Sequence, residues 1–295
     1  MTTAPAHSKT WTTRHLLDWI REALERAGVD SPRLSAEILV SHVLGCERLA
    51  LYTHADRPAS TDERDRLRGL VRRALDHEPV QYLTQRAWFF SMEFHVDTRV
   101  LVPRPSTETL VEIALEHARS LDHPPLIADV CTGSGCVALA LLRHLPEARA
   151  LATDIDPDAI DVACLNAQRL ELDDRFELRQ GDALTALNGE HVDILVANPP
   201  YIPDHEWDDV GPTVKSHEPT HALRGGPDGL DVVRPIIEGA AGVLRPGGFL
   251  GIEVASCHAQ QALELLAQSG AFADCAIHKD IDALDRVVSA LRHSA

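Results

Sequence analysis

The tetrapeptide Asn198-Pro199-Pro200-Tyr201 follows the apolar run 192–197, which is typical of a buried parallel strand. Its two prolines stop a helix and remove two backbone donors. The polar groups that remain are acceptors, the Asn198 side-chain oxygen and the proline carbonyls, and the Tyr201 ring stands beside them. A planar NH2 group fits these residues, because its two N–H bonds meet two acceptors. The tetrapeptide alone is also compatible with an ordinary turn.

A second motif, Asp129-Val-Cys-Thr132-Gly133-Ser-Gly135, ends another predicted strand and opens a helix. Glycines at such a turn allow a ligand to approach the backbone closely. Asp154 ends the next strand, where a carboxylate can hold both hydroxyls of a ribose. A dinucleotide-binding dehydrogenase would need a third glycine where Ala138 stands, and it would leave the tetrapeptide unexplained.

The elements that must position these residues alternate between strand and helix. We expect helices over 136–145, 159–170, 230–244 and 260–268. We expect strands over 126–130, 150–153, 176–179, 192–197, 249–254, 276–277 and 287–291. This order predicts an α/β fold with a mostly parallel sheet and helices on both faces. Asp129, Asp154, Asp182 and Asn198 then meet at the carboxyl edge of the sheet, where such folds bind ligands. Residues 205–227 read as a long loop with a functional or mobile role.

The first part of the chain has a different pattern. Apolar stripes and capping signals predict three helices, over 13–27, 32–45 and 60–78. Residues 86–102 change to strand periodicity and predict a β-hairpin. Its alternating hydrophobic residues are Trp88, Phe90, Phe94, Val96, Val100 and Val102. After Pro103-Arg104-Pro105, we expect Ser106 or Thr107 to cap a further helix.

Composition restricts the function further. Formal net charge is −17, and residues 1–102 are balanced, with 14 basic and 14 acidic residues, whereas residues 103–295 hold 14 and 31. Such an excess repels phosphate backbones, favours basic partners and also serves simple solubility.

No apolar run is long enough for a membrane helix, and residues 1–10 lack a signal-peptide core, so we expect a cytoplasmic protein. The six scattered cysteines and the histidine spacing predict neither a disulfide framework nor a metal site.

Taken together, the motifs give the chain a specific resemblance. It resembles the bacterial protein-(glutamine-N5) methyltransferases of the HemK/PrmC family, which are class I S-adenosylmethionine-dependent enzymes. The likeness covers nearly the whole chain. Beyond the glycine turn, it lies in Glu78-Pro-Val-Gln-Tyr-Leu-Thr84, Val102-Pro-Arg-Pro-Ser-Thr-Glu108, Asn198-Pro-Pro-Tyr-Ile-Pro203, Glu218-Pro219, Asp228-Gly-Leu230 and Asp285-Arg-Val-Val288.

The resemblance implies a Rossmann-like catalytic domain with a seven-stranded sheet over 105–295. It also implies a helical substrate-docking domain over 1–80 and a β-hairpin linker over 81–104. The implied reaction moves a methyl group from S-adenosylmethionine to a glutamine in the Gly-Gly-Gln loop of peptide-chain release factors. No direct nucleic-acid or membrane binding is expected.

Site roles follow from the residues and the resemblance together. We expect Asn198, Pro199 and Tyr201 to act in catalysis, and these three with Pro200 to bind the substrate amide. The expected cofactor-binding residues are Asp129, Thr132, Gly133, Gly135, Asp154, Asp182, Ala183 and Asn198. No metal is expected.

Some residues depart from the pattern of the family. Cys131 stands where the family turn has its first glycine. The segments 131–136 and 87–97 resemble the sister branch, which methylates a ribosomal large-subunit protein, whereas 103–108 and Asp285-Arg286 resemble the release-factor branch. The ribosomal substrate is therefore an alternative.

Other classes remain as rivals. A DNA adenine methyltransferase would also bind an exocyclic amine, but it would need base flipping and a basic groove. A non-catalytic cofactor-binding module is the other. Cys257-His258 could indicate nucleophilic chemistry, but neighbours on a strand would face opposite ways.

Overall fold

The computed structural model describes residues 10–187 and 189–294. The expectation about a signal peptide concerns residues 1–10, of which 1–9 lie outside the described part. Two compact units are present, one comprising residues up to Gln85 together with Pro212–His217, the other Arg86–Gly211 together with Glu218–Ala295. Within the described part, no helix combines the length and the apolar character needed to cross a membrane.

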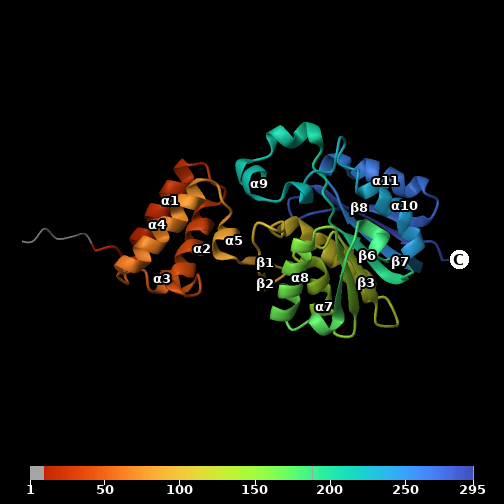
Figure 1. The fold of residues 1–295 in the computed structure, drawn as a ribbon, viewed down its shortest axis with the longest axis horizontal. Coiled ribbons are helices and arrows are strands. Elements are labelled where there is room, and N and C mark those ends of the chain that lie inside the picture. The colour runs from red at the N-terminus through yellow and green to blue at the C-terminus, as the bar shows by residue number, and fades with distance from the viewer. Residues whose placement is uncertain (1–9, 188, 295) are drawn as a thin grey trace, which may run out of the picture. The chain divides into compact units, whose positions relative to one another are not determined.

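The first unit is helical (Figure 1). Its helices are α1 (Thr13–Arg26), α2 (Pro32–Leu44), α3 (Ala50–Thr53), α4 (Thr61–Leu75), α5 (Val80–Thr84) and α9 (Pro212–His217). The predicted capping box is confirmed, since Ser60 accepts from the Glu63 backbone and Glu63 accepts from Ser60. Leu16, Ile20 and Leu39 pack into one hydrophobic core. The short helices α3 and α5 were not predicted, because segments of four or five residues show no helical period.

The second unit contains the predicted sheet. Its seven strands are β3 (Leu126–Val130), β4 (Arg149–Asp154), β5 (Phe176–Gln180), β6 (Val192–Ala197), β7 (Leu244–Glu253), β8 (Phe272–Lys279) and β9 (Asp285–Arg292). Their spatial order is β5-β4-β3-β6-β7-β9-β8, and only β9 runs antiparallel to its neighbours. The expectation of a mostly parallel α/β sheet is confirmed, and β3 and β6 have the predicted bounds.

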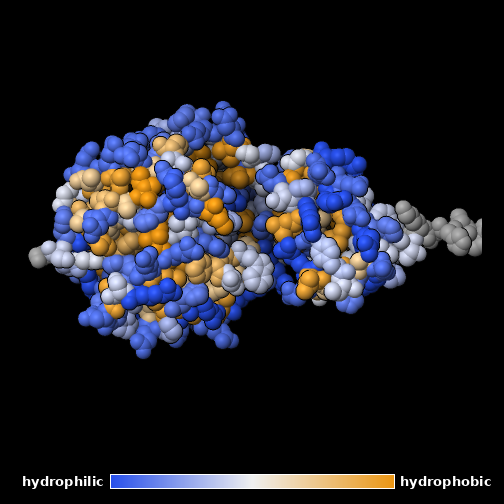
Figure 2. Space-filling view, turned by 180° about the vertical axis from the view of Figure 1, so that it is seen from behind, coloured by the Kyte–Doolittle hydropathy of each residue, from blue (hydrophilic) through white to orange (hydrophobic). Residues whose placement is uncertain are grey.

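Helices cover both faces of this sheet. The helices are α6 (Glu108–Ala118), α7 (Cys136–His144), α8 (Pro157–Arg169), α10 (Val233–Val243) and α11 (Ala259–Gln268). In Figure 1, β3, β6 and β7 lie between α7 and α8 on one side and α10 and α11 on the other. Successive strand residues alternate between the two cores, as Ile127 and Ala128 do. A space-filling view shows patches of hydrophobic residues between hydrophilic ones on the surface of both units (Figure 2).

The hairpin departs from its prediction in register. Its strands are β1 (Ala87–Phe89) and β2 (Met92–Phe94), joined by Phe90 and Ser91 at φ 48° and 61°. Two successive positive φ angles are those of a type I′ turn, which an aromatic residue rarely adopts. The predicted alternation, which grouped Trp88 with the buried Phe94, is therefore wrong at Trp88, since Phe89 is buried and Trp88 is 68% exposed. Val100 and Val102 are buried but lie outside any strand.

Segment 205–227 is not one continuous loop. It contains the short helices η4 (Asp204–Asp209), α9 and η5 (Thr220–Ala222).

The helix predicted over 230–244 is shorter in the structure, where it is α10 (Val233–Val243), and the residues from Leu244 already belong to β7. Gly247 has a φ of 77°, and Gly248 lies so close to the Asp193 carbonyl that a side chain would collide with it. These glycines therefore belong to an irregular start of β7 rather than to a free turn.

Candidate active site

The glycine turn after β3 depends on backbone conformations that favour glycine. Cys131, Gly133 and Gly135 have φ angles of 60°, 54° and 79°. An added Cβ at Gly135 would come within 3.1 Å of the Leu139 side chain, so this glycine allows α7 to pack closely. A Cβ at Gly133 would meet nothing within 4 Å. Gly133 therefore leaves open space in front of the turn.

Asp129 holds this turn in place. Its Oδ2 accepts hydrogen bonds from Thr132 Oγ1 at 2.8 Å and from the Ala138 backbone N at 3.1 Å. Burial raises the pKa of the Asp129 carboxyl to about 7. Asp129 therefore organises the turn and the start of α7.

Asp154, at the end of β4, contacts the same turn from the next strand. Its Oδ2 accepts from the Gly133 backbone N at 2.9 Å and its Oδ1 from the Asp156 backbone N at 3.0 Å. Burial raises the pKa of the carboxyl, and the two backbone N–H groups act in the opposite direction. Each oxygen has further lone pairs for a ligand hydroxyl.

The tetrapeptide emerges directly from β6. Asn198 Nδ2 donates to Thr107 Oγ1 at 3.3 Å. Among the described residues, no group donates a hydrogen bond to Asn198 Oδ1 or to the Pro199 carbonyl. The Tyr201 hydroxyl donates to Glu253 Oε1 at 3.2 Å, and burial raises the pKa of Tyr201, with Glu253 adding to the effect. Asn198 Oδ1 and the Pro199 carbonyl are thus two acceptors without a donor in the described part of the chain.

One cleft of about 370 Å3 lies at this carboxyl edge. Several expected site residues line it: Asp129, Thr132, Gly133, Asp154, Asp182, Ala183, Asn198 and Pro200. Gly135, Pro199 and Tyr201 are not among the lining residues, and Pro199 is buried. The cleft has the size of an ordinary small-molecule site.

Sequence reasoning missed several lining residues. Ser106 or Thr107 was expected to cap a helix; Thr107 is the N-cap residue of α6, but its side chain makes no capping hydrogen bond and accepts from Asn198 instead. Ile155 follows Asp154 and is 60% exposed, and His221 of η5 has its Nε2 atom 2.9 Å from Asp156 Oδ2. An apolar residue straight after a strand-end aspartate was the available signal for Ile155. Nothing in the local sequence marks His221.

Cys257 and His258 do not lie on a strand, so the argument against them was wrong in its geometry. They form the short helix η6 (Ser256–His258), and the Cys257 sulfur is 3.3 Å from His258 Nδ1. Burial raises the pKa of the Cys257 thiol, and Glu206 adds to the effect. The thiol is therefore not activated as a nucleophile. Within residues 10–187 and 189–294, no cluster of three metal-ligating side chains is present.

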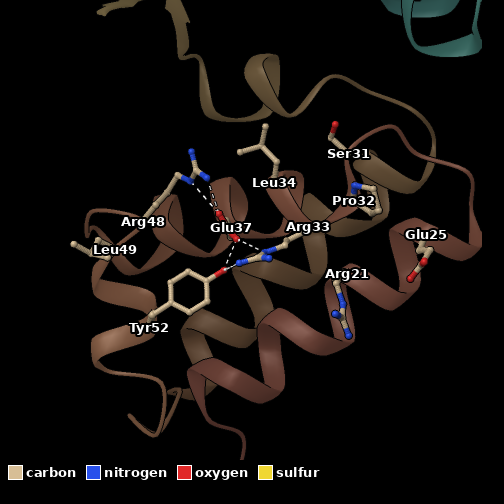
Figure 3. A pocket seen from close by; sticks show the side chains of 10 residues that line it. All are labelled: Arg21, Glu25, Ser31, Pro32, Arg33, Leu34, Glu37, Arg48, Leu49 and Tyr52. Atoms are coloured by element: carbon tan, nitrogen blue, oxygen red, sulfur yellow. Dashed lines mark hydrogen bonds and ion pairs between the residues drawn. The ribbon is translucent and has the colours of Figure 1, made fainter.

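A second hollow, of about 750 Å3, lies in the helical unit (Figure 3). Figure 3 shows Arg33, Arg48 and Tyr52 turned toward Glu37. Glu37 accepts from Arg33 Nε at 3.0 Å, from Arg48 Nη2 at 2.7 Å and from the Tyr52 hydroxyl. Glu37 is therefore held by three partners, which suits a structural role for this glutamate.

Comparison with known proteins gives one answer for both units. A family model of the PrmC N-terminal domain matches residues 15–84, and one of the methyltransferase small domain matches residues 106–214. The release factor glutamine methyltransferase of Geobacter sulfurreducens is 39% identical over 278 residues, covering 94% of this chain and 96% of that protein. That of Chlorobaculum tepidum is 40% identical over 291 residues, covering 96% and 98%.

Among solved structures, a methyltransferase from Pyrococcus furiosus aligns with a TM-score of 0.51 at 15% identity, over 70% of this chain and 91% of that one. It shares the fold of the sheet-containing unit. The relatives match nearly from end to end, across the helical unit as well as the glycine turn and the tetrapeptide. This chain belongs to the release factor glutamine methyltransferase family.

Proposed function

We propose that this chain transfers a methyl group from S-adenosylmethionine to the side-chain amide nitrogen of a glutamine in the Gly-Gly-Gln loop of peptide-chain release factors. The observation that carries the proposal is the free acceptor Oδ1 of Asn198, a residue that lines the cleft in a chain from this family, with the Pro199 carbonyl, which also has no donor in the described part of the chain, directly after it. A primary amide has two N–H bonds for these two acceptors.

The cleft suits the cofactor in three respects. Gly133 leaves room where a side chain would stand, Asp154 offers lone pairs for ribose hydroxyls, and Ile155 exposes an apolar surface for a flat base. Asp182 and Ala183 border the same space. When bound, S-adenosylmethionine supplies an electrophilic methyl group on a sulfonium.

The residues of the tetrapeptide prepare the glutamine. An amide nitrogen is a poor nucleophile, because its lone pair is delocalised into the carbonyl. Asn198 Oδ1 and the Pro199 carbonyl accept its two N–H bonds, orient its lone pair and stabilise the positive charge that develops on nitrogen. Pro199 acts through its backbone, which agrees with its buried ring. Tyr201 packs against the amide plane, with its hydroxyl held by Glu253.

Charge and shape support a basic, glycine-flanked target. Residues 103–295 hold 31 acidic against 14 basic residues, so they attract a basic loop. Glycines beside the glutamine have no side chains that would collide with a narrow cleft. In this proposal residues 1–80 dock the substrate, 81–104 link the units and 105–295 catalyse. The protein acts in the cytoplasm without direct contact with nucleic acid or membrane.

The proposal is tested by intact-mass analysis. Purified release factors, ribosomal proteins and duplex DNA are incubated separately with enzyme and cofactor. We expect a gain of about 14 Da, one methyl group, on the release factors only. A methyl on a ribosomal protein would assign the chain to the sister branch, and a methyl on DNA would overturn protein methylation.

A further inference from the structure

Glu253 is a buried carboxyl group to which the mechanism above gives no catalytic part. It ends β7 with a side chain fully excluded from solvent. The register pairs Ala197 with Ile252, so the next residues, Asn198 and Glu253, leave neighbouring strands side by side. Among the described residues, nothing donates a hydrogen bond to Glu253 Oε2. An unpaired buried oxygen is unfavourable for folding, so a functional reason is to be sought.

The neighbours of Glu253 are the residues that hold the tetrapeptide. The Tyr201 hydroxyl donates to Glu253 Oε1, and Thr107 Oγ1 accepts from Asn198 Nδ2. Burial raises the pKa of the Glu253 carboxyl, while the Thr107 hydroxyl, Arg286 and the Tyr201 hydroxyl act against this rise. Thr107 therefore bonds to Asn198 and lies close enough to Glu253 to lower its pKa, while the Tyr201 hydroxyl donates the hydrogen bond that Glu253 accepts. Thr107 lines the cleft and Glu253 does not, so Glu253 can act on the site only through Thr107 and Tyr201.

The number of protons in this chain of contacts decides which way Asn198 faces. A hydroxyl has one proton to donate, and a carboxylate has none. If Glu253 is held as a carboxylate, with Arg286 as the nearby positive charge, and Thr107 directs its proton to it, the Thr107 oxygen is left to accept from Asn198. The NH2 group of Asn198 must then face Thr107, and Oδ1 must face away from it. Thr107 has no competing duty, since its side chain does not cap α6.

We propose, building on the function above, that Glu253 is a positioning residue that acts through Thr107 to present Asn198 Oδ1, and not its NH2 group, to the substrate amide. With the reverse orientation, two NH2 groups would meet, and one acceptor for the glutamine would be lost. The contact with the Tyr201 hydroxyl fixes the other end of the tetrapeptide on the same carboxyl group.

The test is a set of substitutions on both sides of the contact. Glu253→Gln keeps the shape but adds an NH2 group that can donate to Thr107 and release the Thr107 proton toward Asn198. We expect turnover at saturating substrate to fall about 10- to 100-fold, with cofactor affinity by calorimetry within about twofold. Thr107→Val should cause a similar loss, and Thr107→Ser, which restores the hydroxyl, should recover most of the activity. The double variant Glu253→Gln/Thr107→Val should be no slower than the slower single variant.

Ser289→Ala is the matched control. Ser289 is a buried polar residue on β9, the strand that pairs with β7, and it contacts His278 rather than the tetrapeptide. Its loss should leave turnover unchanged.

If wild-type enzyme methylates the release factor but Glu253→Gln and Thr107→Val turn over within twofold of it, the inference is wrong. Additive losses, or no recovery in Thr107→Ser, would also overturn it. If Glu253→Gln does not fold, the Val and Ser variants of Thr107 decide alone. Failure of the wild-type enzyme itself would instead contradict the proposed function.

Discussion

Two buried glutamates of this protein, Glu37 and Glu253, differ in how their oxygens are paired. Glu37 in the helical unit is 5% exposed and is held by Arg33, Arg48 and Tyr52. Burial raises the pKa of the Glu37 carboxyl, but these hydrogen bonds outweigh burial and the pKa is lowered. Glu253 does not line the cleft itself; it accepts one hydrogen bond, from the Tyr201 hydroxyl, and keeps an unpaired oxygen, and burial raises its pKa.

The difference shows which hollow is built for chemistry. In the larger one, Glu37 is already held by Arg33, Arg48 and Tyr52, so a ligand of this glutamate would have to displace bonds already made. The smaller one keeps acceptors and raised carboxyl pKa values at Asp129 and Asp154. Perturbed groups of this kind cluster at functional sites. Polar groups without partners, and not volume, distinguish the cleft.

The largest effect is expected at Asn198. Asn198→Ala removes an acceptor that acts mainly as charge develops on the substrate nitrogen, so turnover should fall about 10²- to 10³-fold. Cofactor affinity should change much less. Single-turnover rates at saturating substrate measure this, and a rate near that of wild type would remove Asn198 from the mechanism.

Asp129 should give the next largest effect, through pH. Its pKa in the folded chain is about 7, above its ordinary value of 3.8, so the folded chain retains a proton that the unfolded chain has lost. The contribution of this proton to the free energy of unfolding is complete below about pH 4 and is lost as pH rises through about 7. Asp129→Asn keeps one oxygen for both bonds and should be more stable than wild type at about pH 8, by on the order of 2–3 kcal/mol. Urea unfolding without cofactor tests this, and an equal difference at about pH 4 would refute it.

Asp154 should affect binding more than chemistry. Asp154→Ala removes contacts that are already present before the transition state, so cofactor affinity should fall about 10- to 100-fold. Turnover at saturating cofactor should stay within a few-fold of wild type. Calorimetry that found unchanged affinity would show that Asp154 does not hold the cofactor.

Glu37 tests the other side of the comparison. Glu37→Ala removes hydrogen bonds from Arg33, Arg48 and Tyr52, so unfolding should become easier by about 1–2 kcal/mol at neutral pH. Both arginines remain largely exposed and can be hydrated, which limits the loss. Turnover at saturating substrate should not change. A large fall in turnover without loss of stability would give the helical hollow a catalytic role.

The smallest effect is expected at Cys131. Its φ of 60° is a conformation that glycine adopts without strain. Cys131→Gly relieves that strain but frees the unfolded chain, so thermal stability should change by less than about 1 kcal/mol and activity should be kept. Marked loss of activity would reveal a function for the thiol.

The sequence predicted those parts of the site that depend on local pattern. The apolar run 192–197 and the glycines after Asp129 indicated two strands, and parallel strands bring their carboxyl ends to one edge. Thr107, His221 and Glu253 could not be found in this way, because their partners lie far away in the sequence. The hairpin register failed for another reason, since Phe90 occupies a turn position that aromatic residues seldom take.

The most direct measurement locates the methyl group within the substrate. Release factor treated with enzyme and cofactor is digested and analysed by tandem mass spectrometry, beside a release factor whose Gly-Gly-Gln glutamine is changed to glutamate. The two acceptors, on Asn198 and Pro199, predict a gain of about 14 Da on that glutamine and none on the glutamate protein, whose carboxylate has no N–H bond to offer and is repelled by the acceptors. Methylation of the glutamate protein at another residue, or of a different residue in the wild-type factor, would contradict the account.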